Sequence, residues 1–457
     1  MPMKTPDFVS NSTILFCILT AALAQPAWAD VTLHLTIDTH NEPSTQTATQ
    51  AANIPPDTHK SLDVTLADGY ILAKSDTESV IYDFKARRRI AIDAATKTYV
   101  DYSLYDVVGF RALEAQNRDN LRKTLAAAKV NAPLLAKIDT EQSLSLQSAT
   151  PEKIDVAEGD DGFRFSNAGK ELAHWGKKGT EVDATDAARF AQLLRYVDGG
   201  HPQILDKLGR SKAIPDTLVF NHGQIWGPQT HTITVAGVRT IKASPYDLHG
   251  YAKRQASATS APEQLDDILD KAGELPMSGL AAAKAANRAQ SDKDIKAGKI
   301  LDAMLGSIEW NLMTGEQAPP FAPDQQAKVH DDPVIQNISK LLVANTKESL
   351  TEAAKAFAEL RPKAAHKAYV LAIFEANDRL RIGEAPAARK LMREALLANP
   401  YLAGAYKDLG DAFLLQSDSA RAWRCWDAGR RLAPQFANFK AIDQFEKTLV
   451  AQHPEYF

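Results

Sequence analysis

The stretch DLGDAFLLQSDSARAWRCWDAGRRLAP, residues 408–434, decides the fold of the C-terminal part of the chain. Two short amphipathic runs flank a polar break at residues 417–419, and Pro434 follows the second run. Because proline cannot continue the hydrogen-bond ladder of a helix, it ends that run. Gly410 and Ala422 are small where two antiparallel helices would have to approach closely. The stretch therefore predicts a helical hairpin.

A 34-residue period links this hairpin to the segment before it. The pairs that share the spacing are Pro400 and Pro434, Ala388 and Ala422, Met392 and Trp426, and Ala395 and Gly429. Paired helices with this period resemble the tetratricopeptide-repeat family. The residues that match the family's pattern are Tyr406, Leu409, Gly410 and Phe413 in the first helix, and Ala422, Trp426, Gly429 and Pro434 in the second. An unrelated helical bundle is the alternative.

The preceding unit, residues 369–400, matches the pattern less fully. Its second helix fits, whereas Glu375 stands where the family has leucine and Arg379 stands where it has an aromatic residue. Apolar residues at helical intervals in residues 435–452 predict a capping helix. The resemblance implies tetratricopeptide-like repeats over residues 363–457 and leaves the number of complete repeats open.

Arrays of this kind present a curved surface to a protein or peptide, and the fold itself supplies no chemistry. On the first helices of the two units, the resemblance places Asn377, Arg381, Lys407 and Asp411 on the inner surface. The family's carboxylate-clamp pattern, which grips chain termini, is not reproduced because most of its basic residues are missing. We therefore expect these four residues to form a partner-binding groove of mixed charge.

Short alternating runs separated by turn residues dominate the first half of the chain. Residues 62–66 lead into Asp68-Gly69, a hairpin signal because glycine accepts positive φ, and residues 70–74 continue after the turn. Helical patterns at about 110–139 and 185–197 interrupt the strands. The expected organisation is an α+β domain with a mostly antiparallel sheet (30–250), a polar linker (251–262), a helical region (263–362) and an all-α repeat domain (363–457).

Part of the strand block resembles a second family. A short strand and turn are followed by IYDF (81–84), RRRIAID (87–93) and TKTYVDYS (96–103), a rhythm similar to exported lipoprotein-carrier domains. That resemblance implies a curved sheet packed against helices, with an acyl chain in the concavity. A carrier of an apolar or lipid ligand is therefore one alternative function, with a pocket lined by Ile71, Ile81, Phe84, Ile90 and Tyr99.

Residues 1–29 have the features of a signal peptide. An apolar run begins at Ile14, and Ala-Trp-Ala at 27–29 places small residues where signal peptidase reads them. The run of about eleven residues is too short to span a bilayer, which needs about 20. We expect cleavage near Ala29 and a mature protein that is periplasmic or secreted, without a transmembrane span. Cleavage removes Cys17 and leaves Cys425 alone, so no intramolecular disulfide can form.

Recognised catalytic and cofactor motifs are missing from the sequence. A formal net charge of -4 argues against a nucleic-acid partner. His222 and His231 lie close in sequence but lack metal-site spacing, and Glu171 and His174 would face opposite sides of a strand. We therefore expect no catalytic residue, no metal and no cofactor. A non-enzymatic binding or scaffolding protein is the leading hypothesis, and a hydrolase assembled from distant residues is the second alternative.

Overall fold

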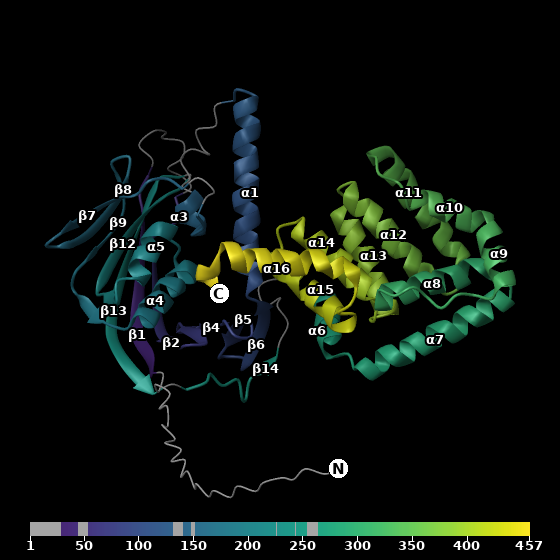
Figure 1. The fold of residues 1–457 in the computed structure, drawn as a ribbon, viewed down its shortest axis with the longest axis horizontal. Coiled ribbons are helices and arrows are strands. Elements are labelled where there is room, and N and C mark those ends of the chain that lie inside the picture. The colour runs from purple at the N-terminus through teal and green to yellow at the C-terminus, as the bar shows by residue number, and fades with distance from the viewer. Residues whose placement is uncertain are drawn as a thin grey trace, which may run out of the picture.

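The computed structural model of the chain describes residues 29–43, 54–130, 140–147, 151–224, 226–242, 244–253 and 264–457. The expected signal peptide lies outside the described residues except for Ala29, and so does the expected linker from residue 254 onward. Within the described residues, a large and mostly antiparallel sheet precedes a region of helices (Figure 1). The predicted α+β class with an α-helical C-terminal region is confirmed.

The main sheet has twelve strands. They are β1 (Ala29–Asn41), β2 (Thr58–Leu66), β3 (Tyr70–Lys74), β4 (Glu78–Asp83), β5 (Arg88–Asp93), β6 (Thr98–Ser103), β7 (Asp155–Gly159), β8 (Gly162–Asn167), β9 (Lys170–Gly176), β12 (Thr217–Gly223), β13 (Pro228–Lys242) and β14 (Ala252–Lys253). Their order is β14-β6-β5-β4-β3-β2-β1-β13-β12-β9-β8-β7, with only the β14–β6 pair parallel. Two short strands, β10 (Gly179–Glu181) and β11 (Ala213–Pro215), pair separately.

Two helices, α4 (Ala184–Val197) and α5 (Pro202–Gly209), pack against one face of the main sheet (Figure 1). Side chains alternate between the two faces of a strand, so β1 directs every second residue at these helices. Leu35 of β1, Phe190 of α4 and Leu205 of α5 are all fully buried in the same core cluster. This face of the sheet is therefore covered by the chain's own side chains.

The five residues expected to line an apolar pocket do not share one face of the sheet. Ile71 and Phe84 belong to the core beneath α4 and α5. Ile81, Ile90 and Tyr99 belong to a separate cluster. The strand register explains the division, because Ile71 pairs with Tyr82, and the neighbour Ile81 therefore points the other way. The prediction of a single pocket lined by these five residues is therefore wrong.

The described helices outside α4 and α5 are α1 (Tyr105–Ala127), α3 (Thr140–Leu144), α6 (Gln264–Glu274), α7 (Met277–Lys296), α8 (Ile300–Thr314), α9 (Pro323–Asp331), α10 (Pro333–Leu341), α11 (Lys347–Leu360), α12 (Ala368–Arg381), α13 (Ala385–Ala398), α14 (Ala403–Leu414), α15 (Ser419–Leu432) and α16 (Lys440–Gln452). Short 3-10 turns follow α11, precede α16 and end the chain. Among the described residues, no helix combines the length and apolar character that a membrane crossing requires.

Helices α12 to α15 form two antiparallel hairpins that stack through α13 and α14. The expected close approach within the second hairpin is confirmed at Gly410. A Cβ atom there would lie 2.3 Å from Nε1 of Trp426 and 3.0 Å from the carbonyl oxygen of Ala422. Gly429 is equally constrained, because its Cβ would lie 2.5 Å from the ring of Phe439. The aromatic and small residues of the pattern thus pack as paired helices require.

The first hairpin departs from the repeat pattern in a way that its side chains explain. Glu375 is only 2% exposed, and its carboxylate lies 3.1 Å from Nε of Arg361 and 2.8 Å from Nε of Arg379. The two positions where leucine and an aromatic residue were expected therefore hold an ion pair. A buried carboxylate is tolerated where a guanidinium neutralises it.

Helix α1 joins the sheet to the helical half. It packs against α15 and α16, and a Cβ atom on Gly109 would lie 2.4 Å from the ring of Trp423. Arg88 of β5 adds an ion pair across the junction, with Nη1 2.8 Å from Oδ2 of Asp427. The rest of α1 projects away from both halves (Figure 1).

Tyr456, after α16, anchors the helical half to the sheet half. Its side chain is fully buried, and its hydroxyl accepts a hydrogen bond from Nη1 of Arg111 (2.9 Å) and lies 3.1 Å from the carbonyl oxygens of Leu144 and Ser145. Its own carbonyl accepts a hydrogen bond from the hydroxyl of Tyr196 in α4 (2.7 Å). The two halves therefore meet through a satisfied polar contact as well as through packing.

Candidate functional site

The first helices of the two hairpins, α12 and α14, bring predicted groove residues together. Asn377 of α12 donates a hydrogen bond from Nδ2 to Oδ2 of Asp408 in α14 (2.8 Å). Lys407 and Asp411, one helical turn apart in α14, form an ion pair. Helix α8 contacts α12 and α14, and Leu312 packs against Gly404 in the first turn of α14. We use the term inner face for Asn377, Asp378, Lys407, Asp408 and Asp411.

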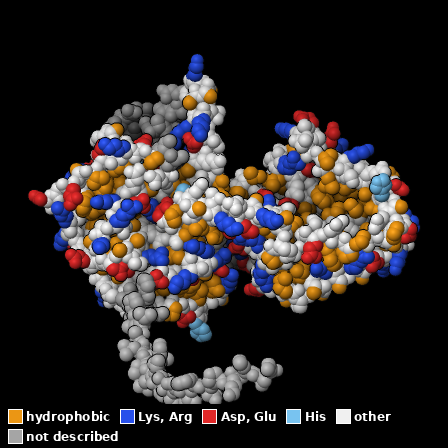
Figure 2. Space-filling view, viewed as in Figure 1, with side chains coloured by type: hydrophobic (Ala, Val, Ile, Leu, Met, Phe, Trp, Pro, Cys, Tyr) orange, Lys and Arg blue, Asp and Glu red, His pale blue; other side chains and the backbone are white. Residues whose placement is uncertain are grey.

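Arg381 is directed elsewhere. Its Nη1 donates to the carbonyl oxygen of Ala344 (2.9 Å), in the connection between α10 and α11, and the residue is exposed. Leu342 and Val343, in the same connection, are 47% and 74% exposed. Figure 2 shows apolar side chains gathered on this side of the helical half, around α10 and α12. Arg381 therefore borders an apolar surface beside the inner face.

Two carboxyl groups of the inner face were not predicted from the sequence. Asp378 is 7% exposed, and within the described residues its Oδ2 has no hydrogen-bond partner. Burial raises the pKa of Asp378 to about 6, although nearby Arg381 opposes the shift. Burial also raises the pKa of Asp408 to about 6, and the amide of Asn377 opposes it. These carboxylates lose hydration without gaining a strong cationic partner.

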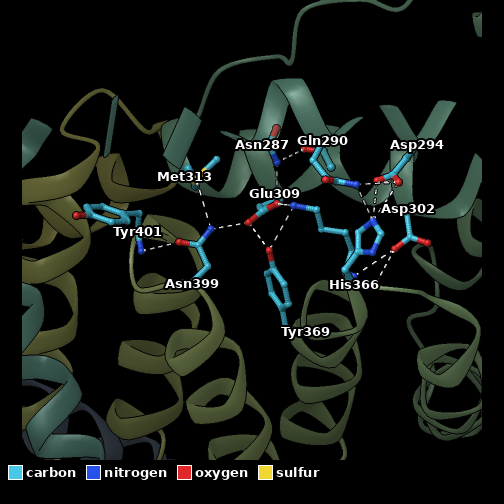
Figure 3. Close-up of polar contacts among 12 residues, drawn as sticks. Asn287, Gln290, Asp294, Asp302, Glu309, Met313, His366, Tyr369, Asn399 and Tyr401 are labelled. Atoms are coloured by element: carbon cyan, nitrogen blue, oxygen red, sulfur yellow. Dashed lines mark hydrogen bonds and ion pairs between the residues drawn. The ribbon is translucent and has the colours of Figure 1, made fainter. Parts of the chain in front are cut away.

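A second polar cluster, drawn in Figure 3, lies where α7 and α8 cross the start of α12. Glu309 of α8 is 3% exposed and accepts hydrogen bonds from Lys367, Tyr369, Asn287 and Asn399, the last two at 2.7 and 2.5 Å. Burial alone raises the pKa of a carboxyl, but the Lys367 ammonium and these hydrogen bonds lower the pKa of Glu309. Four donors satisfy this carboxylate, so its role is to hold the helices together.

Asp302, also in Figure 3, explains how α12 begins. Its carboxylate accepts hydrogen bonds from the backbone N–H groups of Ala365, His366 and Lys367 at 2.9, 3.0 and 3.2 Å. These three residues lie just before α12, so a carboxylate from α8 fixes the backbone turn that leads into the helix.

A third cluster lies between the main sheet and the end of α4. His222 of β12 and His231 of β13 point from the same face, because Phe220 pairs with His231 and His222 with Gln229. Their ring centroids are 4.4 Å apart. Asp198, the C-cap residue of α4, places Oδ1 2.7 Å from Nδ1 of His231. Burial, with a smaller effect of His231, lowers the pKa of His222 to about 4, so His222 is neutral at pH 7.

From the sequence, His222 and His231 were expected to form no metal site, and Asp198 was not singled out. A hairpin between β12 and β13 is local, whereas Asp198 arrives only through the packing of α4 on the sheet. Gly199 and Gly200 follow it with φ of 101° and 117°, a region that favours glycine and lets the chain turn sharply into α5. The Gly-Gly pair was the one sequence signal that α4 ends beside Asp198.

The prediction that Glu171 and His174 face opposite sides of a strand is also wrong. His174 Nδ1 lies 2.5 Å from Oε1 of Glu171. The register with β8 shifts at this point, because Phe165 pairs with Ala173 and Ser166 with Glu171. One extra residue in β9 reverses the alternation and brings both side chains to one side. Arg164 also pairs with Glu171, so the group is an ion-pair cluster at the sheet surface.

Comparison with known proteins does not assign the chain to a family. No protein-family model matches the chain, and no curated protein matches it.

Proposed function

We propose that the chain is an exported, non-enzymatic binding or scaffolding protein that uses the inner face of α12 and α14 to hold a segment of a protein partner. The observation that carries the proposal is the pair of desolvated carboxyl groups, Asp378 and Asp408, on helices joined by the Asn377–Asp408 hydrogen bond. The signal-peptide features of residues 1–29 support export.

The chemistry of the inner face favours a cationic segment. Lys407 is engaged by Asp411, and Arg381 donates to a backbone carbonyl beside Leu342 and Val343. A lysine or arginine side chain from a partner would supply the positive charge that Asp378 and Asp408 lack. Apolar residues of the partner beside that basic side chain would contact Leu342 and Val343. The partner segment we propose therefore combines a basic residue with apolar neighbours.

Peptide binding to the chain from residue 30 onward tests the proposal. The probes are fluorescent peptides with one lysine or arginine in an apolar sequence, each matched by a peptide with glutamate or norleucine at that position. We expect the basic peptides to bind preferentially, and the double variant Asp378→Asn/Asp408→Asn to weaken them about tenfold, the effect of losing one charged hydrogen bond. Asp324→Asn, an exposed carboxyl on α9, is the matched control and should leave binding unchanged.

Two results would contradict the proposal. One is equal binding of basic, neutral and acidic peptides, and the other is unchanged binding by the double variant. Both substitutions keep the shape of the side chain, so circular dichroism should confirm an unchanged fold in each variant.

A further inference from the structure

Asp198, His222 and His231 form a compact group of potential metal ligands in the part of the chain that the structure describes. Each offers one nitrogen or oxygen atom, and the three atoms lie within 4.8 Å of one another. Ligands of one tetrahedral Zn²⁺ ion, at bonds of about 2.0–2.1 Å, lie about 3.3 Å apart. Side-chain adjustments of about 1 Å therefore suffice to close the group around an ion.

The unused polar atoms of the group form a second, independent observation. His222 is 4% exposed, and the Asp198 side chain is 2% exposed. Among the described residues, Oδ2 of Asp198, Nε2 of His222 and Nε2 of His231 have no hydrogen-bond partner. Leaving such atoms buried without partners is costly, and a cation bound within the group would give a partner to each of these atoms that ligates it.

The three residues are held by rigid elements. Neighbouring strands carry the histidines, and the C-terminal end of α4 carries Asp198. The partial negative charge at the end of a helix also favours a cation at that place. Nearby His201 is separately engaged, with Nε2 2.9 Å from Oε2 of Glu141, and is therefore not counted among the ligands.

We infer that Asp198, His222 and His231 bind one divalent transition-metal ion, with Zn²⁺ the best-matched ion. Two imidazoles and a carboxylate suit zinc and related transition metals, whereas Mg²⁺ and Ca²⁺ prefer sites made of oxygen alone. The ion would fasten α4 to the strands β12 and β13. This site is remote from the inner face of α12 and α14 in sequence and belongs to the sheet half, so it does not depend on the proposed peptide binding.

Calorimetric titration of the untagged, EDTA-treated chain with Zn²⁺ alone tests the inference. We expect one ion per chain in the wild type, no comparable binding of Mg²⁺, and an affinity for Zn²⁺ at least about tenfold lower in His222→Gln and Asp198→Asn. The matched control is His174→Gln, which removes a histidine paired with Glu171 on the same sheet and should leave the affinity unchanged. Undiminished zinc binding in both His222→Gln and Asp198→Asn, or no zinc binding in the wild type, would overturn the inference.

A measurement without substitutions covers the case in which a variant fails to fold. A crystal of the wild-type chain soaked in Zn²⁺ should give an anomalous difference peak at the zinc absorption edge between Asp198, His222 and His231. A peak only at other histidines, or no peak, would overturn the inference as well.

Discussion

The indole N–H of Trp426 lies 3.2 Å from a carboxylate oxygen of Asp411. Trp426 belongs to the second helix of the last hairpin and Asp411 to the first, so one side chain both fills the space between the helices and positions an inner-face carboxylate. The same N–H lies 3.3 Å from the carbonyl oxygen of Lys407. Packing of the hairpin and arrangement of the proposed binding surface are therefore coupled.

Gly410 provides the space that Trp426 occupies. Gly410→Ala would place a Cβ atom 2.3 Å from Nε1 of Trp426, so we expect the free energy of unfolding to fall by about 1–3 kcal/mol, as for other overpacked interiors. Urea denaturation measures the loss. Gly273→Ala in α6 is the control, because nothing lies within 4 Å of its Cβ, and it should be neutral or stabilising. Equal effects at both positions would contradict this account.

Lys367 neutralises Glu309 inside the helical half. Lys367→Met leaves a buried carboxylate without its cation, and we expect a loss of about 3–5 kcal/mol of unfolding free energy. The double variant Lys367→Met/Glu309→Gln should recover part of that loss, because the uncompensated charge is gone. Lys355→Met is the control, since its pair with Glu359 is exposed at 3.9 Å and should matter by no more than about 1 kcal/mol. A double variant less stable than Lys367→Met would speak against a charge effect.

Asp408 makes stability depend on pH in a defined direction. Its pKa is about 6 in the folded chain, against 3.8 for the ordinary side chain, so between these values the folded state binds the proton more tightly. Ionisation of Asp408 therefore destabilises the fold above about pH 6, and this effect disappears as the pH falls below about 3.8. We expect Asp408→Asn to raise the unfolding free energy by about 1–2 kcal/mol at pH 7.5, with no gain at pH 3.5. A gain of the same size at both pH values would refute the assignment.

Tyr456 tests the contact between the halves. Tyr456→Phe removes the hydroxyl that accepts a hydrogen bond from Arg111 and lies beside two backbone carbonyls. We expect the free energy of unfolding to fall by about 1–3 kcal/mol, which thermal denaturation would measure. Tyr401→Phe is the control, because its hydroxyl is 3.5 Å from the carbonyl oxygen of Pro276 and exposed. If both variants unfold at the wild-type temperature, the polar contact does not stabilise the junction.

Local patterns predicted the parts of the fold that depend on residues close in sequence. The spacing from Gly410 to Ala422 anticipated the last hairpin, because helix contacts recur with a fixed period. Strand alternation was less secure, since a single extra residue in β9 brought Glu171 and His174 to one side. The predicted apolar pocket was wrong for a related reason, because Ile71 and Ile81 lie on opposite faces of the sheet.

The candidate sites depended on contacts that no local pattern encodes. Asp198 reaches His231 only because α4 packs on the sheet, and Asp408 meets Asn377 only because two hairpins stack. Burial, which sets the pKa of Asp378 and Asp408, also follows from the complete fold. Asn377, Lys407 and Asp411 were predicted as groove residues from the repeat resemblance, and their binding role stays a prediction. Arg381 was predicted beside them, but it donates instead to the carbonyl oxygen of Ala344.

The pairing of β1 with β13 has a kinetic consequence. Thr32 and Arg239 are neighbours in the sheet although 207 residues separate them along the chain. Closing so long a loop is slow, and until it closes β1 presents an unpaired edge. The newly made polypeptide should therefore stay incompletely folded until β13 has been synthesised and has paired with β1.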